Sequence, residues 1–249
     1  MRGGNGSLVK ETKSVEYAVK IIDGSTYSKE AENVYVKQGV GDSKEVLIYF
    51  PGTGGKGNQN NGLKTSNELY YTNNDKEYNN DIFTCNHGGE NTDAASKAKI
   101  AANVETELLN YYGVTKEEFI AQGYSISVAG FSAGGPLAAE VAYILYSEGY
   151  TIDTLGLLDA RFSDLNEGHV AELMNGSSET NLYTLYSDPN AKNNIAVRSS
   201  NATKAVGETY SNEQYAGRVT MQEYNKINHD GLVPAAGENL DQLAGGVAQ

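Results

Sequence analysis

Residues 124–140 read Tyr-Ser-Ile-Ser-Val-Ala-Gly-Phe-Ser-Ala-Gly-Gly-Pro-Leu-Ala-Ala-Glu. In the first half of this stretch Ile126 and Val128 alternate with serines, which is typical of a β-strand. Beyond Gly135 the apolar residues instead follow the spacing of one helix face: Leu137, Val141, Ile144 and Leu145. The stretch therefore predicts a strand that passes directly into a helix.

The residues between strand and helix are Gly130-Phe-Ser132-Ala-Gly134, a Gly-x-Ser-x-Gly motif. A strand that turns sharply into a helix must hold its turn residue in a strained backbone conformation. Glycines two positions before and after leave room for that turn. We therefore predict that the Ser132 hydroxyl stands exposed at the N-terminus of the helix.

The composition is that of an ordinary globular protein. The 249 residues are 39% hydrophobic and 20% charged, enough to bury a sizeable core. No apolar run approaches the roughly 20 residues needed to span a bilayer. The formal net charge of −13 argues against a nucleic-acid or anionic-membrane partner, because either would repel the protein at long range.

The N-terminus and the cysteine content leave the cellular compartment open. Residues 1–13 read as a flexible lead-in without the apolar stretch of a signal peptide, and residues 14–249 as a single domain. Cys85 is the only cysteine, so no internal disulfide can form. A soluble cytoplasmic protein and an exported protein whose signal segment is absent from this chain both fit. The oligomeric state is also left open.

Strand and helix patterns alternate along the chain from Val46 onward. This alternation predicts a mostly parallel sheet with helices on both faces. Two short strands, at residues 15–22 and 33–37, are predicted before it. In parallel sheets ligands collect beyond the C-terminal ends of the strands. Polar candidates follow such ends throughout the chain: Thr53, His87, Ser132, Asp159, Asp188 and His229.

The glycine-rich segment after the strand at residues 45–50 does not match a nucleotide-binding loop. A Walker A loop needs Gly, four residues, and then Gly-Lys-Ser/Thr. Lys56 follows Gly55, but Phe50 and Gly57 occupy the two ends of the motif. The segment is better interpreted as backbone N–H groups presented beyond a central strand.

A serine nucleophile needs a general base, usually a histidine, and an acid that orients it. The chain has three histidines. His169 lies within a predicted helix, and His87 precedes the serine in a position to line a pocket. His229 follows the last predicted strand, and Gly231 would let its loop carry the ring over Ser132. His229 is therefore the predicted base.

Two aspartates are candidates for the acid. Asp159 follows the first strand after the serine helix, and Asp188 follows the second. Asp188 is favoured, with Asp159 as the alternative.

The order Ser132, acid, His229, with residues 130–134 as a nucleophile elbow, resembles the α/β-hydrolase superfamily of esterases and lipases. The resemblance covers residues 15–243. It implies an α/β-hydrolase fold with antiparallel N-terminal strands and a minimal lid between residues 159 and 180. In that family the acid usually follows the second strand after the elbow, although some lipases take it from the first.

The resemblance also implies a site and a reaction. The oxyanion hole would use the amides of Ala133 and Thr53, with Gly54 as the alternative to Thr53 and as a pocket residue beside Phe131 and His87. The reaction implied is hydrolysis of a small-molecule or lipid-like carboxylic ester through an acyl-enzyme, without a metal or an organic cofactor. Amidase, thioesterase and peptidase activity on the same triad, and a non-catalytic binding relative, are the alternatives.

Overall fold

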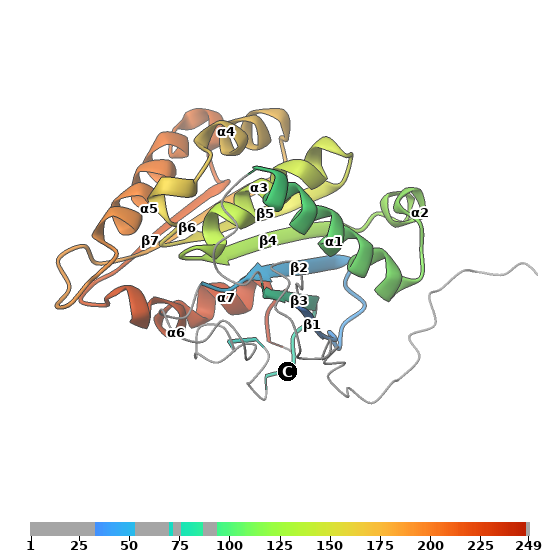
Figure 1. Cartoon of the computed structure of the whole chain (residues 1–249), viewed down its shortest axis with the longest axis horizontal. Helices are drawn as coiled ribbons and strands as arrows, with labels where there is room; N and C mark the ends of the chain where they lie inside the picture. The colour runs from blue at the N-terminus through green and yellow to red at the C-terminus, as the bar shows by residue number, and fades with distance from the viewer. Residues whose placement is uncertain (1–32, 53–69, 72–75, 87–93, 248–249) are drawn as a thin grey trace, which may run out of the picture.

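The computed structural model describes residues 33–52, 70–71, 76–86 and 94–247 (Figure 1). The predicted strand at residues 15–22 lies outside these ranges, as do Thr53, Gly54 and His87.

A seven-stranded sheet crosses the centre of the molecule in the order β1-β3-β2-β4-β5-β6-β7. The strands are β1 (Asn33–Lys37), β2 (Glu45–Phe50), β3 (Asp81–Asn86), β4 (Ser125–Phe131), β5 (Thr151–Leu158), β6 (Asn181–Ser187) and β7 (Val219–Tyr224). Strand β1 pairs with β3 in antiparallel orientation, and every other pair is parallel. The predicted mostly parallel sheet with an antiparallel N-terminal strand is confirmed.

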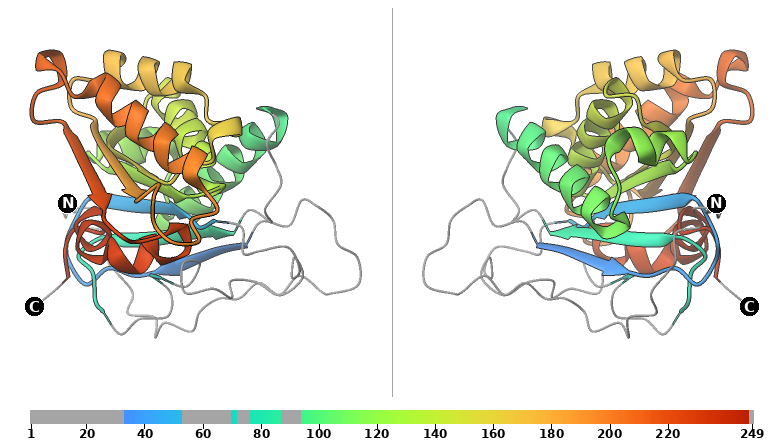
Figure 2. Two further views of the ribbon diagram at one scale, coloured as in Figure 1. Left: turned by 90° about the vertical axis from the view of Figure 1, so that its left-hand side faces the viewer. Right: turned by 90° about the vertical axis from the view of Figure 1, so that its right-hand side faces the viewer.

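Helices cover both faces of the sheet. The helices are α1 (Ala94–Tyr112), α2 (Lys116–Ala121), α3 (Gly134–Ser147), α4 (Glu167–Gly176), α5 (Val197–Tyr210), α6 (Leu232–Ala235) and α7 (Gly237–Leu243), with short 3-10 turns η1 (Phe162–Asp164), η2 (Glu213–Tyr215) and η3 (His229–Gly231). Helices α1, α3, α4 and α5 lie on one face, and α6 and α7 lie on the other (Figures 1 and 2). The segment between β5 and β6 holds α4 and the turn η1, in agreement with the predicted single-helix lid.

The two cores follow from the two-residue period of the central strands. In β2, Val46 and Ile48 are fully buried against the layer of α1 and α3, whereas Leu47 and Tyr49 are buried against α6 and α7. Full burial of an aliphatic or aromatic side chain contributes about 1.5–3 kcal/mol to stability. Because both faces of this strand are covered, its sequence is almost continuously apolar.

Two helical segments differ from the sequence prediction. The sequence between Asn190 and Gly217 predicts an irregular or partly helical region, and the structure forms helix α5 there although this helix contains Ser, Asn, Thr and Gly residues of low helix propensity. It forms by packing closely on the sheet: a Cβ atom at Gly207 would lie 2.3 Å from the Thr184 Oγ1 atom of β6. Residues 232–243, which the sequence predicts to form one closing helix, are divided at Ala236, directly before Gly237.

Helix α2 begins with the capping box that the sequence Thr115-Lys-Glu-Glu118 predicts. The Thr115 side chain accepts the backbone N–H of Glu118, and the Glu118 carboxylate accepts the backbone N–H of Thr115. None of the helices within the described ranges combines the length and the apolar character needed to cross a bilayer.

Candidate active site

Ser132 lies on the turn between β4 and α3 with a left-handed backbone, φ 53°. Its backbone is held on both sides: its N–H donates to the Leu158 carbonyl at 2.8 Å, and its carbonyl accepts the Arg161 N–H at 2.8 Å and the Gly135 N–H at 3.2 Å. A non-glycine residue in this region costs on the order of 1–3 kcal/mol and persists only when the surroundings impose it. The strained elbow predicted at Ser132 is confirmed.

The elbow glycines are required by close backbone contacts. A Cβ atom at Gly130 would lie 2.1 Å from the Gly134 carbonyl oxygen. One at Gly134 would lie 2.1 Å from the carbonyl oxygen of Phe50, at the end of β2. A side chain at Gly130 would therefore push the end of β4 away from the start of α3, and one at Gly134 would push α3 away from the end of β2.

His229 connects Ser132 to a buried carboxylate. Its Nε2 atom lies 2.9 Å from the Ser132 Oγ atom, and its Nδ1 atom lies 3.0 Å from Oδ2 of Asp159. An ionised carboxylate only accepts hydrogen bonds, so Nδ1 carries the proton and Nε2 is free to accept the serine hydroxyl. His229 is 7% exposed and Asp159 is fully buried, so water does not compete strongly for these hydrogen bonds.

Asp159 follows the C-terminal end of β5, also in a left-handed conformation with φ 40°. Its N–H donates to the Leu185 carbonyl of β6 at 3.0 Å. Its Oδ1 atom accepts the Ser187 N–H at 3.0 Å, and its Oδ2 atom accepts the Ser187 hydroxyl at 2.6 Å. Among the described residues the buried carboxylate thus has three donors, two from Ser187 and one from His229.

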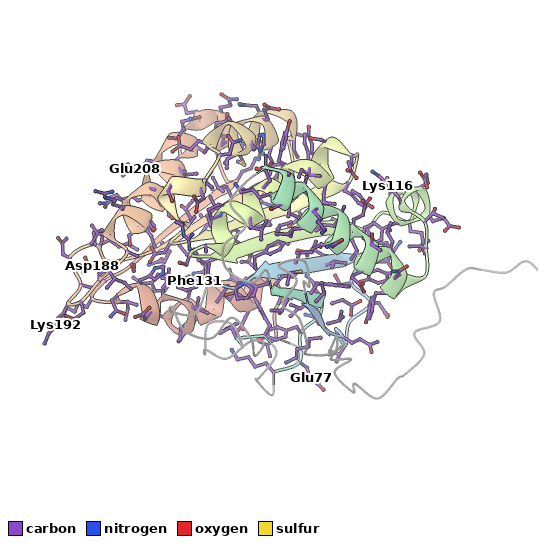
Figure 3. All side chains as sticks on the ribbon, viewed as in Figure 1. Glu77, Lys116, Phe131, Asp188, Lys192 and Glu208 are labelled. Atoms are coloured by element: carbon purple, nitrogen blue, oxygen red, sulfur yellow. The ribbon has the colours of Figure 1, made fainter. Side chains whose placement is uncertain are left out.

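The structure does not bring the favoured acid, Asp188, to His229. Its carboxylate accepts the backbone N–H groups of Asn190 at 2.8 Å and Lys226 at 3.0 Å, and these bonds lower the pKa of the carboxyl group. Figure 3 shows Asp188 toward the edge of the molecule that carries Lys192, away from Phe131. The geometry corrects the sequence preference in favour of the alternative, Asp159. Side chains alternate direction at the end of a strand, and at the end of β6 it is Ser187 that faces inward.

Phe131, predicted as a pocket residue, packs against the imidazole. Its ring stacks on that of His229 with centroids 4.6 Å apart and planes inclined by 26°. Gly52 approaches from β2, where an added Cβ atom would lie 2.8 Å from the Phe131 ring and 3.0 Å from Ser132 Cβ. Phe131 is 4% exposed, so it supports the face of His229 more than it lines an open surface.

One of the two predicted oxyanion donors lies within the described residues. Ala133 follows the nucleophile directly and is the N-cap residue of α3. Within the described ranges no acceptor pairs with its backbone N–H. The second predicted donor, Thr53, its alternative Gly54, and His87 all lie outside the described residues. His169, set aside as the base, pairs instead with Glu140, 3.0 Å from Nδ1 to Oε2.

Ser187 and Asn194 are site residues that the sequence interpretation did not identify. Ser187 binds Asp159, and Asn194 binds Ser187. The one signal in the sequence is the position of Ser187, a polar residue at the end of an apolar strand directly before Asp188. This position does not show which carboxylate the hydroxyl meets, because that carboxylate lies at the end of the neighbouring strand β5.

Comparisons with known proteins identify the fold but give no close relative. A scan against protein-family models gives no match, and a search of curated proteins gives none. Among solved structures, an esterase from Pyrobaculum calidifontis is 12% identical with a TM-score of 0.52, over 86% of this chain and 80% of its own. A study of two fungal esterases from Rhizomucor miehei provides a structure 14% identical with a TM-score of 0.50, over 86% of this chain and 76% of its own. Together with the strand order and the serine elbow, these likenesses show that the chain has the α/β-hydrolase fold.

Proposed function

We propose that this protein is a serine hydrolase that cleaves carboxylic esters through an acyl-enzyme intermediate. The observation that carries the proposal is the continuous hydrogen-bonded series from Ser132 Oγ through His229 to Asp159, with distances of 2.9 and 3.0 Å. Nucleophile and base within such reach, with the base oriented by a third group, are the features that identify an activated serine.

In the first half of the reaction Ser132 Oγ attacks the ester carbonyl carbon while its proton passes to His229 Nε2. The tetrahedral intermediate carries a negative oxygen. When it collapses, the bond to the alcohol breaks, and the alcohol oxygen takes the proton from His229. In the second half water attacks the acyl carbon and gives a proton to His229. His229 returns this proton to Ser132, and the carboxylic acid leaves.

Asp159 holds His229 in the tautomer that these proton transfers require. It also stabilises the imidazolium that forms in both halves of the reaction. A buried carboxylate suits this role because it interacts with the imidazolium in a medium of low dielectric constant. The oxyanion would accept the N–H of Ala133 and, as the resemblance implies, that of Thr53. Removing one oxyanion donor typically costs about 2.7–4 kcal/mol of transition-state stabilisation.

An ester is the first bond to test because the structural neighbours described above are esterases. The short segment that carries α4 suits a soluble or accessible ester, since it offers no large cap over the serine. Amides, thioesters and peptides are alternative substrates for the same three residues. A binding protein that retains the fold is the remaining alternative.

The test combines an active-site probe with turnover. The wild-type protein and the Ser132→Ala variant are incubated with a fluorophosphonate and with p-nitrophenyl esters of increasing acyl length. Ser147→Ala is the matched control, because Ser147 also lies on α3 but its hydroxyl, within the part of the chain that the structure describes, donates only to the Tyr143 carbonyl of its own helix. We expect labelling and turnover in the wild type and in Ser147→Ala, and neither in Ser132→Ala.

Labelling that persists in Ser132→Ala would exclude the proposed nucleophile. Matched p-nitroanilide and thioester substrates separate the alternative reactions, because the proposal requires the ester to have the highest kcat/KM. A wild-type protein that neither reacts with the probe nor turns over any of these substrates would favour the binding protein.

A further inference from the structure

The Asp159 carboxylate shares one of its oxygens between two donors. Oδ2 accepts the Ser187 hydroxyl at 2.6 Å and lies 3.0 Å from His229 Nδ1. The 2.6 Å distance is that of a charge-assisted O–H···O⁻ hydrogen bond, which is about twice as strong as a neutral one. Ser187 is fully buried, so no water can replace its hydroxyl without a rearrangement.

The hydrogen-bonding capacity of the Ser187 hydroxyl is filled. It has one proton, which must point to the carboxylate because the carboxylate can only accept. Its two lone pairs accept the Asn194 side-chain amide at 3.0 Å and the Ser200 hydroxyl at 2.8 Å. The proton of Ser187 is therefore directed at Asp159 by partners from the loop before α5 and from α5 itself.

Asn194 connects this cluster to the loop that follows β6. Besides Ser187, its side-chain amide donates to the Asp188 carbonyl at 2.8 Å, and its side-chain oxygen accepts the Ala196 N–H at 2.9 Å. The loop between β6 and α5 is thus bonded to Ser187, the residue that binds the Asp159 carboxylate.

We propose that Ser187 is a positioning residue for the triad: through its hydroxyl, supported by Asn194 and Ser200, it fixes the rotation of the Asp159 carboxylate so that Oδ2 faces His229 Nδ1. This inference rests on the proposed function in that it assigns Asp159 as the acid. The backbone N–H of Ser187 holds Oδ1, and its hydroxyl holds Oδ2, so one residue sets both oxygens of the carboxylate. Without the hydroxyl, Oδ2 loses its shorter hydrogen bond and the carboxylate is free to turn away from the imidazole.

The test compares variants that remove, keep or weaken the Ser187 hydroxyl with a control variant at the other end of β6. Ser187→Ala removes the hydroxyl and keeps the backbone donor to Oδ1. Ser187→Thr keeps a hydroxyl at the same place, and Ser187→Cys keeps the size with a weak donor. Thr180→Val is the matched control, because the Thr180 hydroxyl is also fully buried and donates to the Ile152 carbonyl, but at the opposite end of β6.

We expect Ser187→Ala to lower kcat for a p-nitrophenyl ester about 10- to 100-fold, the range found when the hydrogen-bond partner that orients a metal-binding side chain is removed. KM should not change, because Ser187 touches no substrate. Ser187→Cys should fall between Ala and wild type, and Ser187→Thr should recover most of the loss. Thr180→Val should unfold at a lower temperature with wild-type kcat.

A second readout does not depend on turnover. A proton shared between His229 Nδ1 and a buried carboxylate gives a low-field proton NMR resonance, and we expect Ser187→Ala and Ser187→Cys to shift or broaden it. Unchanged kcat and an unchanged resonance in these two variants would overturn the inference, as would an equal loss of kcat in Thr180→Val. If instead the wild type lacks all esterase activity, the proposed function fails, and the resonance alone decides whether Ser187 orients the pair.

Discussion

Oδ2 of Asp188 accepts the backbone N–H of Lys226 at 3.0 Å, three residues before His229. The Asp188 N–H also donates to the Ile227 carbonyl at 3.0 Å. Lys226 is in the left-handed region with φ 64°, so the chain turns sharply at this point. Asp188 therefore anchors the backbone of the loop that carries the histidine, whereas Asp159 contacts the imidazole itself.

This division predicts unequal effects of two matched substitutions. Asp159→Asn should lower kcat about 10⁴-fold, because an amide donor facing Nδ1 imposes the wrong tautomer on His229. Asp188→Asn should lower kcat less than about tenfold, since the amide oxygen still accepts one backbone N–H. The remaining effect comes from a less ordered histidine loop. Ester turnover by both variants measures the ratio, and a larger loss in Asp188→Asn would restore Asp188 as the acid.

Phe131 offers a test of whether the imidazole needs its aromatic neighbour. Phe131→Ala should reduce the free energy of unfolding by about 3–5 kcal/mol, as expected for a large buried side chain. Phe131→Leu keeps an apolar side chain, and a hydrophobic exchange of this kind costs less than about 1.5 kcal/mol. Phe131→Leu loses the stacked contact with the His229 ring. We therefore expect its kcat to be lower than that of the wild type even under conditions in which the variant is fully folded.

Denaturant unfolding and ester kinetics on both Phe131 variants separate these effects. A wild-type kcat in Phe131→Leu would show that the stacking has no part in positioning His229. A change confined to KM would instead support the original prediction that Phe131 lines the substrate pocket.

Two glycine substitutions separate the cost of a steric clash from the cost of a left-handed backbone conformation. Gly123→Ala places a methyl group in open space at φ +74°, so it should cost only the left-handed strain of about 1–2 kcal/mol. Gly134→Ala drives a Cβ atom to 2.1 Å from the Phe50 carbonyl and should be considerably more destabilising. It should also abolish fluorophosphonate labelling, because Gly134 belongs to the turn that presents Ser132. Equal unfolding free energies for the two variants would contradict the close approach.

Buried tyrosines predict a loss of stability at high pH. Burial raises the pKa of Tyr71 well above its usual value, and its hydroxyl donates to the Leu240 carbonyl at 2.7 Å. Burial and then the Asp81 charge raise the pKa of Tyr112, whose hydroxyl donates to Asp81 at 2.6 Å. In the unfolded chain both ionise near pH ~10, whereas the native state keeps them protonated.

Because the unfolded state then binds fewer protons than the native state, the free energy of unfolding is unaffected below pH ~10 and falls as the pH rises above it. Circular dichroism and phenolate absorbance recorded along an alkaline titration check this. The last tyrosines should ionise together with the loss of the folded signal. Complete ionisation with the fold intact would contradict the assigned burial.

The elements that local patterns describe were predicted well. The elbow at Ser132, the strand before it, the helix after it and the capping box at Thr115 each depend on residues close together in the sequence. Helix α5 was predicted only as part of an irregular or partly helical region, because its stability comes from packing on the sheet more than from its own residues. The residues near each aspartate in the sequence do not show which one is the acid, because Asp159 and Asp188 both follow the C-terminal ends of neighbouring parallel strands.

Patterns in the amino-acid sequence were enough to predict the kind of sheet, the place of the sharp turn at Ser132, and His229 as the base among three histidines. The contacts between Asp159 and His229, between Ser187 and Asp159, and between Asp188 and the histidine loop became known from the folded chain. They depend on the direction of each side chain at a strand end. A shift of one residue turns a side chain to the opposite side, and the hydrogen bonds across neighbouring strands fix which residue faces inward.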